Sequence, residues 1–242
     1  MKIINSYSPN FDTKKRSLNS IKLIVIHYTG MQSERESLIR LCDLKSKVSS
    51  HYFIKGNGKV LKLVEDHFVA WHAGKSYWKN FKFLNKNSIG IEISNPGHQF
   101  NYKKFSQKQI KSVIQLTKYL KLKYKINSKN ILGHSDIAPS RKKDPGEKFP
   151  WELLSKYNIG VWHSLDKKII KSCRQKSTNN IEKKLFFSYL IEIGYFFKKK
   201  NTNSILSVVK AFQRRFRPDL INGKIDVECL KIAKNLVKSG FN

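Results

Sequence analysis

Apolar residues in the first part of the chain follow the patterns of buried strands. Residues 21–26 (IKLIVI) are rich in β-branched side chains and almost continuously apolar, which is typical of a strand covered on both faces. This run ends at His27. Farther along, HYFI (51–54) and VLKLV (60–64) flank the turn sequence KGNGK, and together they predict a β-hairpin.

A further buried strand and an amphipathic helix follow. Residues 89–93 (IGIEI) predict a short buried strand that carries a single acid, Glu92. From Ser106, a suitable N-cap, helical spacing continues through Ile110, Val113, Ile114, Thr117, Leu120 and Tyr124. Strands that alternate with helices predict an α/β domain in which helices flank a mixed β-sheet.

The pattern changes after Trp151. Residues 164–183 are polar, rich in lysine and only weakly periodic, and we interpret them as a linker. Three short helical patterns follow at 185–193, 205–212 and 227–237. We therefore expect a catalytic domain at 1–163, a linker at 164–183, and a small three-helix domain at 184–242 that is an appendage to the first.

Composition favours a globular chain with an excess of positive charge. Hydrophobic residues make up 40% of the 242 positions, and no run approaches the roughly 20 apolar residues of a membrane span. The net charge of +31 would attract polyanions. However, 40 lysines stand against 8 arginines, and arginine is the usual reader of bases and phosphates. We expect no specific nucleic-acid partner.

Three residues have the chemistry of a catalytic metal site. His27 ends an apolar run, and His134 and Asp144 lie ten positions apart in a segment rich in glycine and proline. Two imidazole nitrogens and one carboxylate oxygen would leave the fourth position of a tetrahedral zinc site open. Taken singly, each histidine is more typical of a hydrogen-bonded core residue, and sequence alone does not establish that the three converge. The cysteines are too widely spaced for a metal pair or a disulfide framework, and we expect them to be buried: Cys42, Cys173 and Cys229.

The motifs around these residues resemble one family. Their order is that of zinc-dependent N-acetylmuramoyl-L-alanine amidases of the AmpD/AmiD type, whose fold is similar to that of peptidoglycan recognition proteins. The opening SPNFD (8–12) is more similar to the AmiD branch. The resemblance covers about residues 3–155, and its motifs are HYTGM (27–31), VSSHYFI (48–54), AWHAG (70–74), SIGIEISN (88–95) and GHSDIAPSRKKDPGEKFPW (133–151).

The resemblance implies a role for each motif residue. His27, His134 and Asp144 match the ligands of one Zn²⁺ per chain. Glu92 matches the general base, and Lys142 matches the lysine that stabilises the oxyanion. Without the resemblance, Glu92 would be interpreted as a buried salt-bridged carboxylate and Lys142 as a surface charge. The implied reaction is hydrolysis of the amide bond between N-acetylmuramic acid and L-alanine, in peptidoglycan or in muropeptides.

The remaining conspicuous side chains receive weaker interpretations. We expect His51 and His72 to line the pocket or to support the ligands from behind, and Trp71 to pack beside the cleft. We expect surface positions for the other histidines: His67, His98 and His163. Glu147 stands where the family usually has proline or a small residue.

The C-terminal part is similar to three-helix peptidoglycan-binding domains. The similarity rests on LIEIGYF (190–196), VVKAFQRRF (208–216) and INGKIDVECLKIA (221–233), with departures at Asn222, Asp226 and Cys229. The complete ligand set favours an enzyme over the alternative, a non-catalytic peptidoglycan recognition protein. We expect a monomer. The lack of a signal-peptide pattern favours the cytoplasm, whereas the AmiD-like features favour the periplasm or cell envelope.

Overall fold

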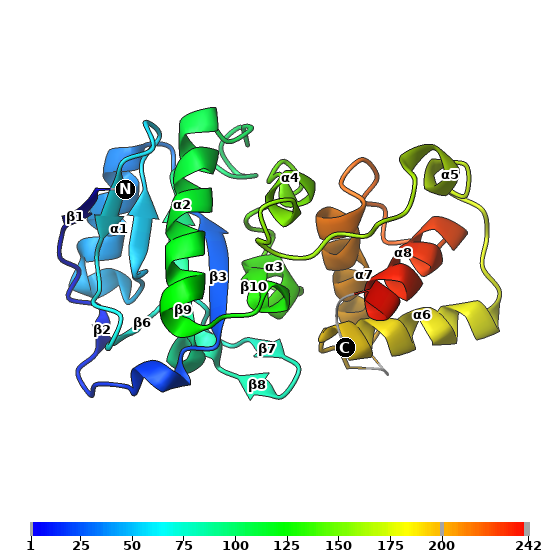
Figure 1. The fold of residues 1–242 in the computed structure, drawn as a ribbon, viewed down its shortest axis with the longest axis horizontal. Coiled ribbons are helices and arrows are strands. Elements are labelled where there is room, and N and C mark those ends of the chain that lie inside the picture. The colour runs from blue at the N-terminus through cyan, green and yellow to red at the C-terminus, as the bar shows by residue number, and fades with distance from the viewer. Residues whose placement is uncertain (1, 199–200, 240–242) are drawn as a thin grey trace.

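The computed structural model describes residues 2–198 and 201–239. It places a sheet-containing N-terminal part beside a C-terminal helical region, as Figure 1 shows. We use "C-terminal helical region" for Lys167–Ser239. Across the described ranges, no helix combines the length and the apolar character that crossing a membrane requires.

Six strands of the described residues form the central sheet, which is mixed as predicted. The predicted hairpin is present, because β4 pairs antiparallel with β5, while every other neighbouring pair in the sheet is parallel. The spatial order is β1 (Ile3–Asn5), β5 (Val60–Lys62), β4 (Tyr52–Ile54), β9 (Ser88–Ile93), β3 (Leu23–Tyr28) and β10 (Ile131–Gly133). Two small antiparallel sheets join β2 (Phe11–Asp12) to β6 (Val69–Ala70), and β7 (Tyr77–Trp78) to β8 (Phe81–Lys82).

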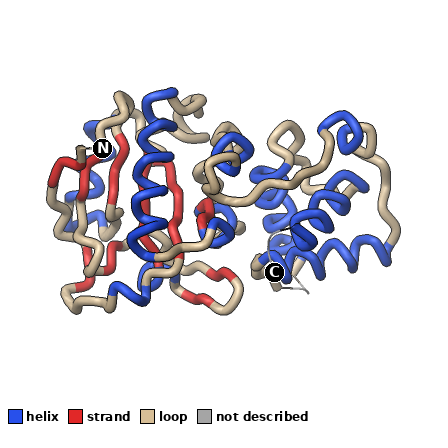
Figure 2. Tube along the Cα trace, viewed as in Figure 1, coloured by secondary structure: helices blue, strands red, loops and turns tan. Residues whose placement is uncertain are grey.

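One face of the sheet is covered by the predicted long helix, α2 (Gln107–Tyr124), which lies across the strands in Figures 1 and 2. Ser106 caps it: its hydroxyl oxygen accepts a hydrogen bond from the Gln109 backbone N–H, and the Ser106 backbone N–H donates to the Gln109 side-chain oxygen. Alternate strand residues pack against its apolar side, and all are fully buried: Ile24, Ile26, Ile89, Ile91 and Ile93. Each such side chain stabilises the fold by about 1.5–3 kcal/mol.

The opposite face of β3 is also buried, which explains its continuous apolar run. Leu23 and Val25 belong to one hydrophobic cluster with Phe186 and Phe212 of the C-terminal helical region. Both faces of this strand are therefore covered, by α2 on one side and partly by the helical region on the other. The remaining helices are α1 (Glu34–Cys42), α3 (His134–Ile137), α4 (Trp151–Ser155), α5 (Lys167–Lys171), α6 (Asn180–Ile193), α7 (Thr202–Phe216) and α8 (Val227–Ser239).

The structure differs from expectation in the segment interpreted as a linker. Residues 164–183 contain α5 and the start of α6; Ile170 and Cys173 are both buried, and Ile170 belongs to one hydrophobic cluster with Phe186 and Phe212. Arg174 in the same segment donates to Glu228 of α8 at 2.7 Å. The many lysines obscure the apolar pattern of this segment. Its two buried hydrophobic residues, Ile170 and Cys173, are about one helical turn apart and pack the segment onto its neighbours. The helical region is likewise no loose appendage, because it shares a hydrophobic cluster with β3.

Candidate metal centre and active-site cleft

The sheet register brings the two candidate histidine ligands together. Strands β3 and β10 are parallel and paired so that Gly133 lies opposite Ile26. The residues that follow this pair are His134 and His27, which therefore lie side by side. The carboxyl ends of parallel strands meet at one edge of a sheet, where open α/β sheets form their sites. Convergence of these two residues is a direct consequence of the strand pairing.

Asp144 reaches the same point from the loop after α3. The Ser135 backbone N–H donates to the Asp144 carbonyl at 2.8 Å, which ties the end of the loop to the start of the helix. Within the loop, the backbone N–H groups of Arg141 and Lys142 both donate to the Ala138 carbonyl at 3.0 Å. Short internal bonds of this kind fix the path of the loop, so the carboxylate is held by backbone as well as by its own contacts.

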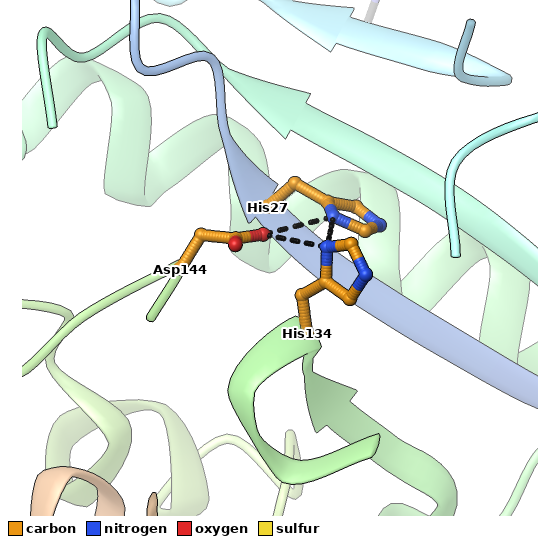
Figure 3. Close-up of side chains that lie close together, drawn as sticks. All are labelled: His27, His134 and Asp144. Atoms are coloured by element: carbon orange, nitrogen blue, oxygen red, sulfur yellow. Dashed lines mark hydrogen bonds and ion pairs between the residues drawn. The ribbon is translucent and has the colours of Figure 1, made fainter. Parts of the chain in front are cut away.

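The three side chains point toward one another, as Figure 3 shows. His27 Nδ1 lies 2.9 Å from His134 Nδ1, and Asp144 Oδ2 lies 3.0 Å from each nitrogen. Zinc bonds of about 2.0–2.1 Å in a tetrahedron would hold such atoms about 3.3 Å apart. Small outward rotations would therefore admit the ion. Two facing imidazole nitrogens beside one carboxylate form a donor set that suits a metal ion, and all three residues are buried.

The other nitrogen of each histidine is also held. His27 Nε2 lies 3.1 Å from His72 Nδ1, and His134 Nε2 lies 3.1 Å from the Ala73 carbonyl oxygen. Such outer contacts fix the tautomer and the orientation of a ligating ring. His72 fits because its neighbour on β9 is Gly90: a Cβ at that position would lie 2.4 Å from the His72 ring. The expectation that His72 lies against the ligands is confirmed.

Burial sets the protonation states of these groups. Desolvation, with the neighbouring His134 as a second cause, lowers the pKa of His27 to about 4. The imidazole is then neutral at pH 7 and can offer a lone pair to a metal. Burial alone would raise the pKa of Asp144, but the charges and hydrogen bonds of the two histidines hold it far below its usual range. A neutral imidazole beside an ionised carboxylate is the state that metal binding requires.

Glu92 lies opposite His27 in the pairing of β9 with β3, on the same face of the sheet. Its Oε2 is buried and has no hydrogen-bond partner among the described residues. Burial, followed by the charge of Asp144, raises the pKa of Glu92 to about 8. A purely structural role as a salt-bridged carboxylate would require an ion pair, and none is found for Glu92 in the described part of the chain. An unpaired carboxyl group with a raised pKa in a cleft is typical of a functional site.

These groups open into a cleft of about 710 Å³. Glu92 and Lys142 line it together with the three candidate ligands, and Trp71 forms part of its wall as expected. Basic side chains are numerous around it, including Arg40 and Lys143. The cleft is therefore suited to a substrate that carries negative charge.

Two histidines expected at the surface are elsewhere, so those expectations were wrong. His98 lines the cleft, with Nδ1 at 2.8 Å from the Tyr28 hydroxyl and Nε2 at 3.0 Å from Glu147 Oε2. His98 follows β9, whose carboxyl end lies beside that of β3. This position after a predicted strand could have identified His98 as a cleft residue. His163 is buried and stacks on Trp162. His51 lies behind His72, their ring centroids 5.6 Å apart, and is absent from the cleft wall.

Comparison with known proteins agrees with this site. A family model described as N-acetylmuramoyl-L-alanine amidase matches residues 17–147, a range that contains all five candidate site residues. N-acetylmuramoyl-L-alanine amidase AmiD of Escherichia coli (strain K12) is 34% identical over 252 aligned residues, which span 98% of this chain and 90% of AmiD. The chain belongs to the N-acetylmuramoyl-L-alanine amidase family.

Solved structures extend the agreement to the fold of the whole chain. The complex of E. coli AmiD with the substrate anhydro-N-acetylmuramic acid-L-Ala-D-gamma-Glu-L-Lys has a TM-score of 0.82 and 35% identity, covering 96% of this chain and 93% of that one. AmpDh3 from Pseudomonas aeruginosa, in complex with anhydromuramic pentapeptide, has a TM-score of 0.79 and 29% identity, covering 94% of each chain. The AmpD/AmiD resemblance and the mixed-sheet fold are confirmed. This amidase hydrolyses the bond between N-acetylmuramic acid and L-alanine, as predicted.

Proposed function

We propose that this amidase is zinc-dependent, with one Zn²⁺ held by His27, His134 and Asp144. The observation that carries the proposal is the convergence of three buried ligand atoms, 2.9–3.0 Å apart, at the floor of the cleft. Two nitrogens and one oxygen suit zinc, and a three-residue set leaves a position for water or substrate. When bound there, zinc would acidify a water and polarise the carbonyl group of the scissile amide.

Glu92 is the proposed general base. The positive charge of a zinc ion held by the three ligands would lower the pKa of Glu92 and favour its ionised form. The unpaired Oε2 of that carboxylate would accept a proton from the attacking water and pass it to the leaving nitrogen of L-alanine. The proton moves from water to Glu92 as the C–O bond forms, and from Glu92 to nitrogen as the C–N bond breaks. Lys142, which lines the same cleft, is the proposed source of positive charge for the carbonyl oxygen as that oxygen becomes negative.

We infer that soluble muropeptides are substrates. AmiD and AmpDh3 are both known in complex with anhydromuramic peptides, and this chain covers over nine-tenths of each of those two structures. Arg40 and Lys143 at the cleft are suited to the carboxylates of a stem peptide. Small muropeptides would suit action in the cytoplasm, and intact murein would suit the cell envelope.

We further propose that the C-terminal helical region adds affinity for the polymer, on the basis of its resemblance to peptidoglycan-binding domains. The residues that depart from that pattern form hydrogen bonds and an ion pair within this chain. Asp226 pairs with Arg217 and accepts from the Cys229 backbone at 2.9 Å, while Asn222 accepts from Gln213 at 3.2 Å. Co-sedimentation with sacculi measures this affinity directly. Retention of the intact chain supports it, and absence of retention in moderate salt contradicts it.

Metal analysis tests the ligand assignment. Purified wild-type protein is expected to contain one zinc per chain, and His134→Ala and Asp144→Ala to lose it together with amidase activity. His67→Ala is the matched control, because this half-buried imidazole lies outside the cleft. Chelation should abolish hydrolysis, and added zinc should restore it. Full hydrolysis by metal-free protein would overturn the proposal.

A further inference from the structure

Helix α7 of the C-terminal helical region contacts the loop that carries two of the three candidate ligands. This loop, residues 133–147, runs from the end of β10 through His134 to Asp144 and beyond. Helix α7 packs against α3, which begins at His134, as Figure 1 shows. Apolar side chains of both helices belong to one hydrophobic cluster, and two successive arginines near the end of α7, Arg214 and Arg215, are buried beside it.

Arg215 forms polar and aromatic contacts with the N-terminal part. Its guanidinium forms an ion pair with Asp136 and donates to the Ile131 carbonyl at 3.1 Å. It also stacks over the Trp151 ring, 4.2 Å from the centroid. Arg215 is 2% exposed, so its two terminal nitrogens exchange water for these partners, while its Nε has no hydrogen-bond partner among the described residues.

Asp136 lies within this loop and links its first residues to the helical region. One of its carboxylate oxygens accepts from the Tyr195 hydroxyl at 2.8 Å, a second residue of the helical region. The other, which faces Arg215, also accepts from the Gly133 backbone N–H at 2.8 Å. Gly133 immediately precedes His134. The helical region therefore holds the carboxylate that fixes the turn from which the ligand projects.

Arg214 forms an ion pair at the other end of the same loop. Its Nε lies 3.9 Å from Glu147 Oε2, three residues beyond Asp144. Glu147 in turn accepts from His98 at 3.0 Å, and His98 contacts Tyr28, the neighbour of His27. The Glu147 carboxylate therefore links α7 to the cleft wall.

We propose that Arg215, with Arg214, positions the metal-binding loop, so that the C-terminal helical region is needed for a preorganised metal site. An apolar contact would hold the two parts together equally well, and often at a lower cost in desolvation free energy than a buried charge. A guanidinium fork, however, fixes the direction of its partners. This inference takes the three ligands of the proposed function as given. Arg215 acts through Asp136 and does not touch the reacting groups.

Zinc affinity measured by competition with a chelator tests the proposal. Arg215→Lys and Arg215→Met, compared as folded proteins at low temperature, should bind zinc more weakly than wild type by on the order of 10–100-fold. Their kcat on a soluble muropeptide at saturating zinc should fall with little change in KM. Arg214→Met should show a smaller effect of the same kind. If Arg215→Met does not fold, Arg215→Lys and Arg214→Met still decide the question.

Arg217→Met is the matched control. Arg217 is equally buried near the end of α7, but its acidic partners, Asp226 and Glu228, lie within the helical region. This variant should lose stability while the folded protein keeps wild-type zinc affinity. Zinc affinity and kcat in the Arg215 variants equal to those of wild type would overturn the proposal. Absence of zinc from the wild type would instead refute the ligand assignment on which it rests.

Discussion

Glu92 and His27 occupy paired positions on neighbouring parallel strands, so the proposed base and one ligand are placed by backbone hydrogen bonds. A one-residue slip of either strand would turn its side chain to the face covered by α2. The apolar residues at alternate positions exclude that slip, because Ile91 and Ile93 would then leave the core. At this scale the register of the sheet defines the site.

Replacing Glu92 by Gln removes the proton acceptor and keeps the shape of the side chain. We expect the variant to retain zinc and to lose kcat on a muropeptide by about 100-fold or more, because no other described carboxylate is unpaired in the cleft. Metal content and single-turnover rates are the measurements. Loss of zinc with the activity would move Glu92 into the ligand set.

Lys142 and its neighbour Lys143 offer a matched pair. Both line the cleft, but Lys142 is half-buried and Lys143 is exposed. Lys142→Met should lower kcat with little change in KM, because its charge is most needed when the oxyanion forms. Lys143→Met should alter mainly KM. Equal kinetic effects of the two substitutions would contradict a specific role for Lys142.

At the scale of elements, Asp66 joins the end of α2 to the sheet. It is buried and accepts from Tyr52 of β4 at 2.8 Å, from Lys123 at 2.9 Å, and from the Tyr124 hydroxyl. Burial alone would raise the pKa of Asp66, but these hydrogen bonds hold it below its ordinary value. A carboxyl group whose folded-state pKa is lowered stabilises the fold above its unfolded pKa, near 4. That contribution is lost as pH falls through the folded-state value.

Asp66→Asn should lower the free energy of unfolding by about 1–3 kcal/mol at pH 7. The difference from wild type should shrink below about pH 4, where the wild-type carboxyl group begins to take up a proton in the unfolded state, and should disappear as pH falls through its folded-state pKa. Urea unfolding at pH 7 and pH 3 measures it. Glu65→Gln is the control, since the Glu65 side chain is 50% exposed and its ion pair with Lys62 is worth about 0–1 kcal/mol. A deficit that is the same at both pH values would contradict the assignment.

The sequence predicted those elements whose apolar pattern has one clear period. Strand 21–26, the hairpin and the capped helix are all present, because each buries a regular set of side chains. Helix α5 was not predicted, since Ile170 is its one buried residue and three of the other four are lysines. His98 was misplaced because its environment comes from Tyr28 and Glu147, 70 and 49 residues away. Contacts of that range are set by strand order, which a local pattern does not contain.

At the scale of the whole molecule, one hydrophobic cluster crosses between the two parts of the chain. Leu23, Trp78 and Leu132 of the N-terminal part belong to it together with Phe186 and Phe212 of the helical region. The buried arginines of α7 lie along the same contact. Independent folding of a catalytic domain, which the sequence pattern suggested, would leave this apolar surface exposed to water.

Truncation after residue 165 is therefore expected to give an unstable or aggregating product with little amidase activity. The exposed surface would include fully buried side chains such as Leu23 and Trp78. Solubility, circular dichroism and thermal melting measure the effect, and co-expression of residues 166–242 should restore the fold. A soluble truncated chain with wild-type melting would contradict the shared core.

Mass spectrometry of one digest tests the central claim most directly. Anhydro-N-acetylmuramic acid-L-Ala-D-gamma-Glu-L-Lys would be incubated with metal-stripped protein and with the same protein after addition of one equivalent of zinc. The account predicts no reaction in the first sample. In the second it predicts two products, free anhydro-N-acetylmuramic acid and the intact tripeptide. Cleavage at any other bond, or equal cleavage without zinc, would contradict it.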